Sequence, residues 1–263
     1  MSVPRMSTSP FSPVRPKRRT SDKLIFISCE GSVTEWEYFE KIIKRVFANI
    51  NSKVSVINVL EETLNKKDKN RTSEERKLAS SANPKNILDK MDKYISDHKD
   101  EYNFDDHKDD EFWLIMDVDD HTDKDIKDAS GASNLDKWNE VLSQCKNNKY
   151  QYAVSNPFFE LWLLLHFDDV VNEDRIYAVT DSHSYEQTSH YRDRLKELGV
   201  PLKKTKSIRV NDYAKYSKDK INEAILRAKV LGNPSCDWPQ DLGTTVYRLL
   251  ESISEIDSQY ENN

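Results

Sequence analysis

The stretch FWLIMDVDD occupies residues 112–120 and joins a run of large apolar side chains to a group of aspartates. A short continuous apolar run is typical of a strand that is covered on both faces, as strands of parallel sheets are. The run stops at Asp117, and Asp119 and Asp120 follow it closely. We therefore expect a central strand at 112–116, with carboxylates just beyond its carboxyl end.

The segments on both sides of this strand alternate between strand and helix patterns. Apolar runs at 23–28, 53–60 and 150–154 predict further strands. Helices are expected at 36–48, where apolar residues recur every three or four positions, and at 84–98, 133–146 and 158–167. This alternation predicts βαβ units, and so an α/β fold with a mainly parallel sheet flanked by helices.

Composition changes along the chain divide it into three parts. Residues 1–22 are rich in Pro, Ser, Lys and Arg and predict a disordered basic arm. Residues 23–168 carry the alternating pattern and form the expected α/β domain, with a polar insertion at 61–81. From 169 to 263 the pattern favours helices alone, at 185–198, 212–231 and 243–256, which we interpret as a C-terminal helical lobe.

Net charge does not argue against a nucleic-acid substrate. The 263 residues contain 46 acidic and 40 basic side chains, a formal charge of −6. Residues 97–128 alone hold fourteen Asp and Glu against four Lys, a local charge of −10, so the remaining chain carries +4. The protein is therefore a mildly basic body around one acidic segment.

Several functional classes are disfavoured by composition. No stretch approaches the ~20 apolar residues of a membrane span, and the N-terminus has no apolar signal-peptide core, so we expect no membrane and a cytoplasmic location. The 3 cysteines form no C-x-x-C pair, which argues against a disulfide framework or a cysteine-based zinc site. With only 5 glycines and no Gly-rich phosphate loop, any ATP-driven step would require another polypeptide.

Carboxylates follow two of the expected strands. Glu30 leaves the first strand, and Asp117 and Asp119 leave the third, with one residue between them that allows both to face one side in extended backbone. Ligands of parallel sheets gather beyond the carboxyl ends of the strands, so these three side chains are expected to converge. Hard oxygen ligands select Mg²⁺ or Mn²⁺. Ordinary loop and capping roles remain the alternative.

A further carboxylate, Glu160, lies in a segment that is apolar on nearly every face. A buried carboxylate needs a partner, which is either the strand-end carboxylates with their metal or an arginine or helix-cap contact. His166 in the same segment is interpreted as a hydrogen-bonded core histidine. Glu35 is expected either to support the site from behind Glu30 or to stabilise the first turn of a helix.

Two other known motifs also begin with an aspartate in the position of Asp117. An EF-hand loop beginning there would need Gly and Glu where Thr122 and Asp128 stand, so this motif is excluded. A haloacid-dehalogenase phosphatase also places D-x-D after a buried strand and remains open. Against it, Asp120 and His121 stand where that pattern usually has Gly-Thr.

These residues carry a resemblance. The glutamate after a strand, the later D-x-D and the order of elements resemble the Toprim fold of topoisomerases, primases and OLD-family nucleases. More specifically, the chain resembles the RloB-like proteins, which are related to the abortive-infection component AbiLii. The matching segments are CEG at 29–31, TE at 34–35, YF at 38–39, SNPFFELWLLLHF at 155–167, NPS at 233–235 and TTVYRL at 244–249. Residues 236–243 interrupt a segment that resembles a continuous Asn-Pro-Ser-Thr-Thr sequence in the relatives.

The resemblance implies a metal-dependent nuclease in bacterial antiphage defence. Glu30 would be a metal ligand or general acid/base, Asp117 and Asp119 would hold Mg²⁺ or Mn²⁺ against a phosphate oxygen, and Glu160 would complete a second metal position. Glu35 and Asp120 would lie behind these ligands. The substrate would be RNA, tRNA included, or DNA, and a separate ATPase subunit and a homo-oligomer stay open.

Residues 201–231 offer the expected substrate contacts. Nine Lys and Arg face three acids there, a charge of +6, and Tyr213 and Tyr216 are placed to stack on bases. The cations proposed to contact nucleic acid are Lys203, Lys204, Lys206, Arg209 and Lys215. A solvated helix face is the alternative for each lysine, and a non-catalytic sensor that binds an ATPase is the alternative for the whole protein.

Overall fold

The computed structural model describes residues 23–30, 34–47, 54–58, 83–122, 124–175, 185–204, 208–209, 213–231 and 236–261. The expected basic arm and the expected insertion at 61–81 lie outside these residues. Side chains are described for most, but not all, of the positions in these ranges.

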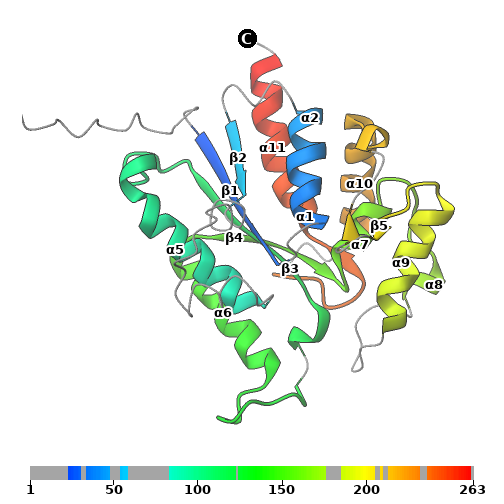
Figure 1. Cartoon of the computed structure of the whole chain (residues 1–263), viewed down its shortest axis with the longest axis horizontal. Coiled ribbons are helices and arrows are strands. Elements are labelled where there is room, and N and C mark those ends of the chain that lie inside the picture. Colours follow the sequence, from blue (N-terminus) through cyan, green and yellow to red (C-terminus); the bar gives the residue numbers. More distant parts are fainter. Residues whose placement is uncertain are drawn as a thin grey trace, which may run out of the picture.

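A five-stranded sheet forms the centre of the molecule, in the order β2-β1-β3-β4-β7 (Figure 1). Its first four strands are parallel, and β7 pairs antiparallel with β4. The strands are β1 (Lys23–Cys29), β2 (Val54–Asn58), β3 (Glu111–Asp117), β4 (Gln151–Asn156) and β7 (Gly243–Thr244). The prediction of an α/β fold with a mainly parallel sheet and a central strand at 112–116 is confirmed.

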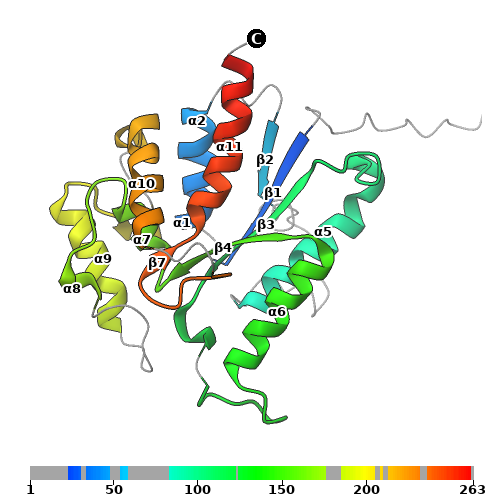
Figure 2. The same cartoon turned by 180° about the vertical axis from the view of Figure 1, so that it is seen from behind.

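Helices cover both faces of this sheet because alternate strand residues are apolar on both sides. Leu24 and Phe26 of β1 pack in one core with α5 (Pro84–Tyr102) and α6 (Asn134–Asn148). Ile25 and Ile27 point to the opposite core, which is larger. Figure 2 shows α5 and α6 on one side of the sheet and α1, α10 and α11 on the other. None of the helices in the described ranges combines the length and apolarity needed to cross a membrane.

Local capping fixes where α5 and α6 begin. The Asn83 side chain accepts a hydrogen bond from the backbone N–H of Asn86 at 2.9 Å, and Pro84 occupies the first turn. Ser133 and Asp136 form a reciprocal capping box at the start of α6. Both helices therefore begin at the residues that the sequence predicted.

The helices of the larger core come from both ends of the chain. This core contains residues of η1, α7, α9, α10 and α11. The segment expected as one helix at 36–48 consists of three consecutive parts: α1 (Thr34–Glu37), a π-helix η1 (Tyr38–Ile43) and α2 (Lys44–Val46). The helices that follow β4 are α7 (Phe159–Leu164), α8 (Asn172–Arg175), α9 (Tyr185–Glu197), α10 (Lys218–Leu231) and α11 (Val246–Glu261). Residues beyond 169 thus share a core with the α/β domain.

The expectation of helices alone after residue 169 is wrong in detail. Two-residue strands occur at β5 (Lys203–Lys204) and β6 (Ile208–Arg209), which pair with each other, and β7 extends the main sheet. The side chain of Thr245 accepts a hydrogen bond from Val154 N at 2.8 Å, and Thr245 N donates to Val154 O at 2.8 Å. Strands of two residues are too short to show a period of two in the sequence.

His166 is a core histidine, as the sequence predicted. It is 0% exposed, and its Nδ1 lies 2.9 Å from the backbone oxygen of Trp162 while its Nε2 lies 3.0 Å from the hydroxyl of Tyr38. Because a carbonyl oxygen only accepts, Nδ1 carries the proton, and Nε2 accepts from Tyr38. Burial lowers the pKa of His166 to about 3, so the ring is neutral in the folded protein.

This histidine makes stability depend on pH. In the unfolded chain the imidazole has a pKa of about 6.5, so the unfolded state gains a proton first as the pH falls, and the free energy of unfolding decreases between about pH 6.5 and 3. A shift from about 6.5 to about 3 corresponds to a full effect of the order of 5 kcal/mol. Urea denaturation from pH 7 to 4 should show a shallower decline for His166→Gln. Parallel profiles would contradict the assignment.

Candidate metal and phosphate site

Three parallel strands end at one edge of the sheet, as the sequence argument required. Cys29 of β1 is in register with Ile115 of β3, and Asp117 of β3 is in register with Ser155 of β4. The backbone N–H of Glu30 continues the ladder by donating to Ile115 O at 3.0 Å. The residues that follow these strands are therefore neighbours at the carboxyl edge.

Glu30 is held at this edge by two hydrogen bonds. Its Oε2 accepts from the backbone N–H of Asp117 at 3.0 Å, and its Oε1 lies 2.7 Å from Nε2 of His121. The Glu30 side chain is 11% exposed and that of His121 is 16% exposed. Glu30 thus joins the ends of β1 and β3 and has an imidazole beside it that can carry a proton.

Asp117 lies on the side of the sheet where α7 begins. The backbone N–H of Phe159 donates a hydrogen bond to its carboxylate, which lowers its pKa. Its Oδ1 is buried and has no hydrogen-bond partner among the described residues. Burial raises the pKa of Asp117 well above its usual value, and the charges of Glu35, Glu30 and Glu160, in that order, raise it further.

These four acids form what we call the carboxylate cluster: Glu30, Glu35, Asp117 and Glu160. They come from the end of β1, from α1, from the end of β3 and from α7. The charges of the other three carboxylates raise the pKa of Asp117, because like charges repel one another. This repulsion makes the cluster unfavourable unless a cation lies among the carboxylates. The sequence predicted that Glu30 and Asp117 converge together with Asp119, and it left Glu160 and Glu35 each with two alternatives.

The cluster has the oxygen donors that Mg²⁺ and Mn²⁺ prefer, and the unpartnered Oδ1 of Asp117 is available to a cation. The described side chains do not by themselves bring three His, Cys, Asp or Glu together within metal-binding reach. The D-x-D motif has a further acid, Asp119, whose side chain lies outside the described part of the chain, as does that of Asp120. The donor chemistry is that preferred by a hard divalent cation, and Asp117 and Glu30 are the candidate ligands whose side chains the structure describes.

The backbone at Asp119 differs from the expectation of extended chain. The strand ends at Asp117, and a 3-10 helix, η3 (Asp119–Thr122), begins two residues later. Val118 N donates to Ser155 O at 2.8 Å, and His121 N donates to Val118 O at 2.9 Å, so the chain turns at Val118. This turn brings His121 back to Glu30.

Glu160 has the arginine partner that was one of the two alternatives left open by the sequence. Arg192 donates to its Oε1 from Nε at 2.9 Å and from Nη2 at 2.7 Å. The charge of Glu160 also reaches Asp117. The arginine alternative is therefore present, and Glu160 still belongs to the carboxylate cluster.

Sequence reasoning missed two polar residues near Glu30, Lys90 and His121. Lys90 of α5 is 4% exposed, and the side chain of His121 is 16% exposed. Burial lowers the pKa of Lys90, while the charges of Glu30 and Cys29 act to raise it. Lys90 lies next to Met91 on the apolar face of α5. Its place among apolar residues that recur at helical spacing was the sequence signal that this lysine faces the interior. His121 follows the D-x-D motif directly, which was its only signal.

The basic segment at 201–231 is less available than its charge suggested. Tyr216 is 0% exposed, so the expectation that it stacks on bases is wrong. Lys218, Lys220 and Lys229 form ion pairs with Asp257, Glu223 and Glu251. Lys215 is exposed and donates to Gly199 O at 2.5 Å. Lys206 lies outside the described residues, as do the side chains of Lys203, Lys204 and Arg209.

A cavity of about 240 Å³ lies between the first turns of α5 and α6 and η3. His121 lines it and contacts Glu30, and Trp138 stacks on His121 with ring centroids 6.3 Å apart. Lys85 and Lys137 also line it, and each also forms an ion pair with an aspartate. The cavity thus offers aromatic and cationic side chains next to the carboxylate cluster.

Comparisons with known proteins bear on the family of the chain. Neither the search of curated proteins nor the search of solved structures found a match. The model of one protein family, described as RloB-like protein, matches residues 25–253. This match includes β2, β3 and β4, all of β1 except its first two residues, and the whole carboxylate cluster. The chain therefore belongs to the family of RloB-like proteins.

Proposed function

We propose that the protein is a Mg²⁺- or Mn²⁺-dependent endonuclease that hydrolyses phosphodiester bonds in RNA, tRNA included, or in DNA. The observation that carries this proposal is the buried, unpartnered Oδ1 of Asp117 within a cluster of four carboxylates at the carboxyl edge of the sheet. Such a cluster is unfavourable alone and becomes favourable around a divalent cation. The resemblance to Toprim-fold nucleases supports the same chemistry.

Each residue of the cluster has a distinct role in this proposal. Asp117 and Asp119 hold the cation, Glu30 is a ligand or the general acid/base, and Glu160 serves a second metal position. The bound cation would offset the negative charge that develops on the phosphate during hydrolysis. His121 hydrogen-bonds to Glu30 at 2.7 Å and is placed to hold or pass on a proton there. Glu35 and Asp120 support the ligands.

The environment of Asp117 favours a diesterase over the dehalogenase-like alternative. In that alternative Asp117 attacks phosphate as a nucleophile. Its carboxylate is buried, its pKa is raised, and three further carboxylates lie around it. A phosphate monoester carries about two negative charges at neutral pH, so it is repelled more strongly than a diester by the same cluster.

The cavity beside His121 is our candidate for a contact with the nucleic acid next to the cleaved bond. Lys85 and Lys137 supply positive charge at its wall. Lys203, Lys204, Lys206, Arg209 and Lys215 stay candidates for a more distant contact with the same strand. A role in antiphage defence, with a separate ATPase subunit, is proposed from the family resemblance.

The test is cleavage of labelled tRNA, single-stranded RNA and duplex DNA in Mg²⁺, Mn²⁺ or EDTA, with p-nitrophenyl phosphate as a monoester control. We expect cleavage of at least one nucleic acid that EDTA abolishes and that Glu30→Gln reduces by about 10² or more. The matched control Glu140→Gln changes an exposed glutamate of α6 and should cleave normally.

Two results would contradict the proposal. Turnover of the monoester with trapping of an aspartyl-phosphate would favour the phosphatase. Absence of hydrolysis with every nucleic acid, also when a partner ATPase is added, would favour a sensor without catalytic activity.

A further inference from the structure

Arg192 makes the direct contact between α9 and the carboxylate cluster. Its Nε and Nη2 donate to Glu160 at 2.9 and 2.7 Å, and both donate to the same oxygen, Oε1. The Glu160 side chain is 8% exposed and that of Arg192 is 29% exposed, so the pair is largely shielded from water. Two bonds to one oxygen restrict the rotation of the carboxylate.

The other oxygen of Glu160 is left for a different partner. No described residue donates a hydrogen bond to Oε2. Glu160 directly follows Phe159, whose backbone N–H donates to the carboxylate of Asp117, so Glu160 lies beside Asp117 where α7 begins. Arg192 therefore holds Glu160 by one oxygen, and the second accepts no hydrogen bond from the part of the chain that the structure describes.

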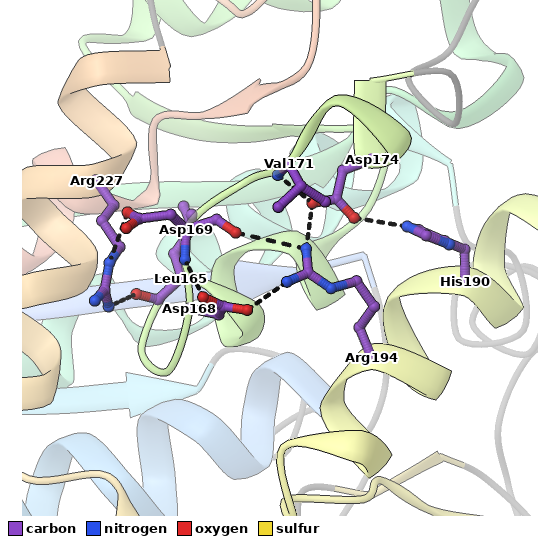
Figure 3. Close-up of polar contacts among 8 residues, drawn as sticks. All are labelled: Leu165, Asp168, Asp169, Val171, Asp174, His190, Arg194 and Arg227. Atoms are coloured by element: carbon purple, nitrogen blue, oxygen red, sulfur yellow. Dashed lines mark hydrogen bonds and ion pairs between the residues drawn. The ribbon is translucent and has the colours of Figure 1, made fainter.

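The neighbours of Arg192 on α9 fix the helix against the segment 165–174. His190 Nε2 lies 2.6 Å from Oδ1 of Asp174, Tyr191 donates to Asp174 O at 3.0 Å, and Arg194 pairs with Oδ2 of Asp174. Figure 3 shows His190 and Arg194 pointing from α9 toward Asp174. With residues on both sides of it held in this way, Arg192 has a fixed place from which to reach Glu160.

The same segment is held from its other side by α10. Arg227 donates to Leu165 O at 2.8 Å and to Oδ1 of Asp169 at 3.0 Å, and Figure 3 shows it on the opposite side of the segment from Arg194. Leu165 directly follows α7, the helix that carries Glu160. Both members of the pair are therefore attached to one framework.

We propose that Arg192 is a positioning residue that orients Glu160 toward the second metal position assigned to it above, an inference that rests on the proposed function. Arg192 does not touch the cation or the substrate and acts through Glu160. Residues that orient a metal ligand typically contribute 10- to 100-fold to metal affinity. Arginine suits this role because its planar group fixes direction as well as charge.

The test is a double-mutant cycle on Mn²⁺ affinity, measured by calorimetry or electron paramagnetic resonance in the absence of substrate. We expect Arg192→Met to weaken Mn²⁺ binding about 10-fold or more, with Arg192→Lys between it and the wild type. In a Glu160→Gln background, Arg192→Met should add less than about 2-fold. Lys196→Met removes an equal charge from an exposed position of α9 and should leave Mn²⁺ affinity unchanged.

The outcomes separate this inference from the proposed function. Equal effects of Arg192→Met in both backgrounds, or none in either, would overturn the positioning role. Should Arg192→Met fail to fold by circular dichroism, Arg192→Gln takes its place in the cycle and is judged by the same two criteria. Loss of Mn²⁺ binding in Asp117→Asn supports the cluster as the metal site whatever Arg192 does, whereas unchanged binding in Asp117→Asn contradicts the proposed function itself.

Discussion

Replacing Asp117 with asparagine is expected to lower the rate of metal-dependent cleavage by at least about 10³-fold, which corresponds to ~4 kcal/mol of lost transition-state stabilisation. Asparagine keeps the shape of the side chain but removes the charge that holds the cation. The Phe159 N–H still finds an oxygen to bond, so the local backbone is preserved. The measurement is single-turnover cleavage of the preferred substrate in Mg²⁺ and in Mn²⁺.

The same substitution is expected to raise stability when no metal is present. Burial and the neighbouring carboxylates raise the pKa of Asp117 in the folded state. An acid whose pKa is higher in the folded than in the unfolded state destabilises the folded protein at every pH above its unfolded pKa of about 3.9. This destabilisation grows as the pH rises and becomes constant once the pH exceeds the folded pKa. Metal-free Asp117→Asn should therefore melt at a higher temperature than the wild type at pH 7.5, and the difference should shrink toward pH 4.

Opposite signs for activity and stability make this prediction specific. A substitution that merely damaged the fold would lower both. Adding Mn²⁺ should raise the melting temperature of the wild type and leave that of Asp117→Asn unchanged. Asp193→Asn, at an exposed position of α9, is the matched control and should change neither quantity. Full cleavage by Asp117→Asn would remove Asp117 from the site.

Much of the fold could be predicted because its signals are local. The apolar run at 112–116 and the caps at Asn83 and Ser133 each depend on a few neighbouring residues. The π-helix within 38–43 and the two-residue strands could not be predicted, because their conformations are set by packing against distant segments. β7, for example, pairs Thr244 with Ser155, which lie 89 positions apart in the chain.

The candidate site also has residues that could be predicted from the sequence and others that could not. Glu30, Asp117 and Glu160 could be placed together from one rule, that parallel strands and the helices following them share an edge. Arg192 lies 32 positions from Glu160 and could not be assigned to it, since no sequence pattern links a helix arginine to one particular carboxylate. Tyr216 looked like a stacking residue because it alternates with lysines, but its ring fills the larger core.

A second large effect is expected at Asp174, whose side chain is 0% exposed. It accepts hydrogen bonds from Val171 N at 2.8 Å, from His190 Nε2 at 2.6 Å and from Arg194 (Figure 3). Arg194 itself is only 14% exposed. Removing one partner of a buried ion pair leaves the other charge unpaired, which typically costs about 3–5 kcal/mol.

Asp174→Ala is therefore expected to lower the free energy of unfolding by about 3–5 kcal/mol in urea denaturation, whereas Asp168→Ala should cost about 1 kcal/mol or less. Asp168 is the matched control because it pairs with the same Arg194 but is 43% exposed. Hydrogen exchange at the amides of α9 should accelerate in Asp174→Ala and not in Asp168→Ala, because the side chain of Asp174 also holds His190 of α9. Equal costs for the two substitutions would mean that the buried contacts of Asp174 do not hold α9 in place, and the fixed position of Arg192 would then need another cause.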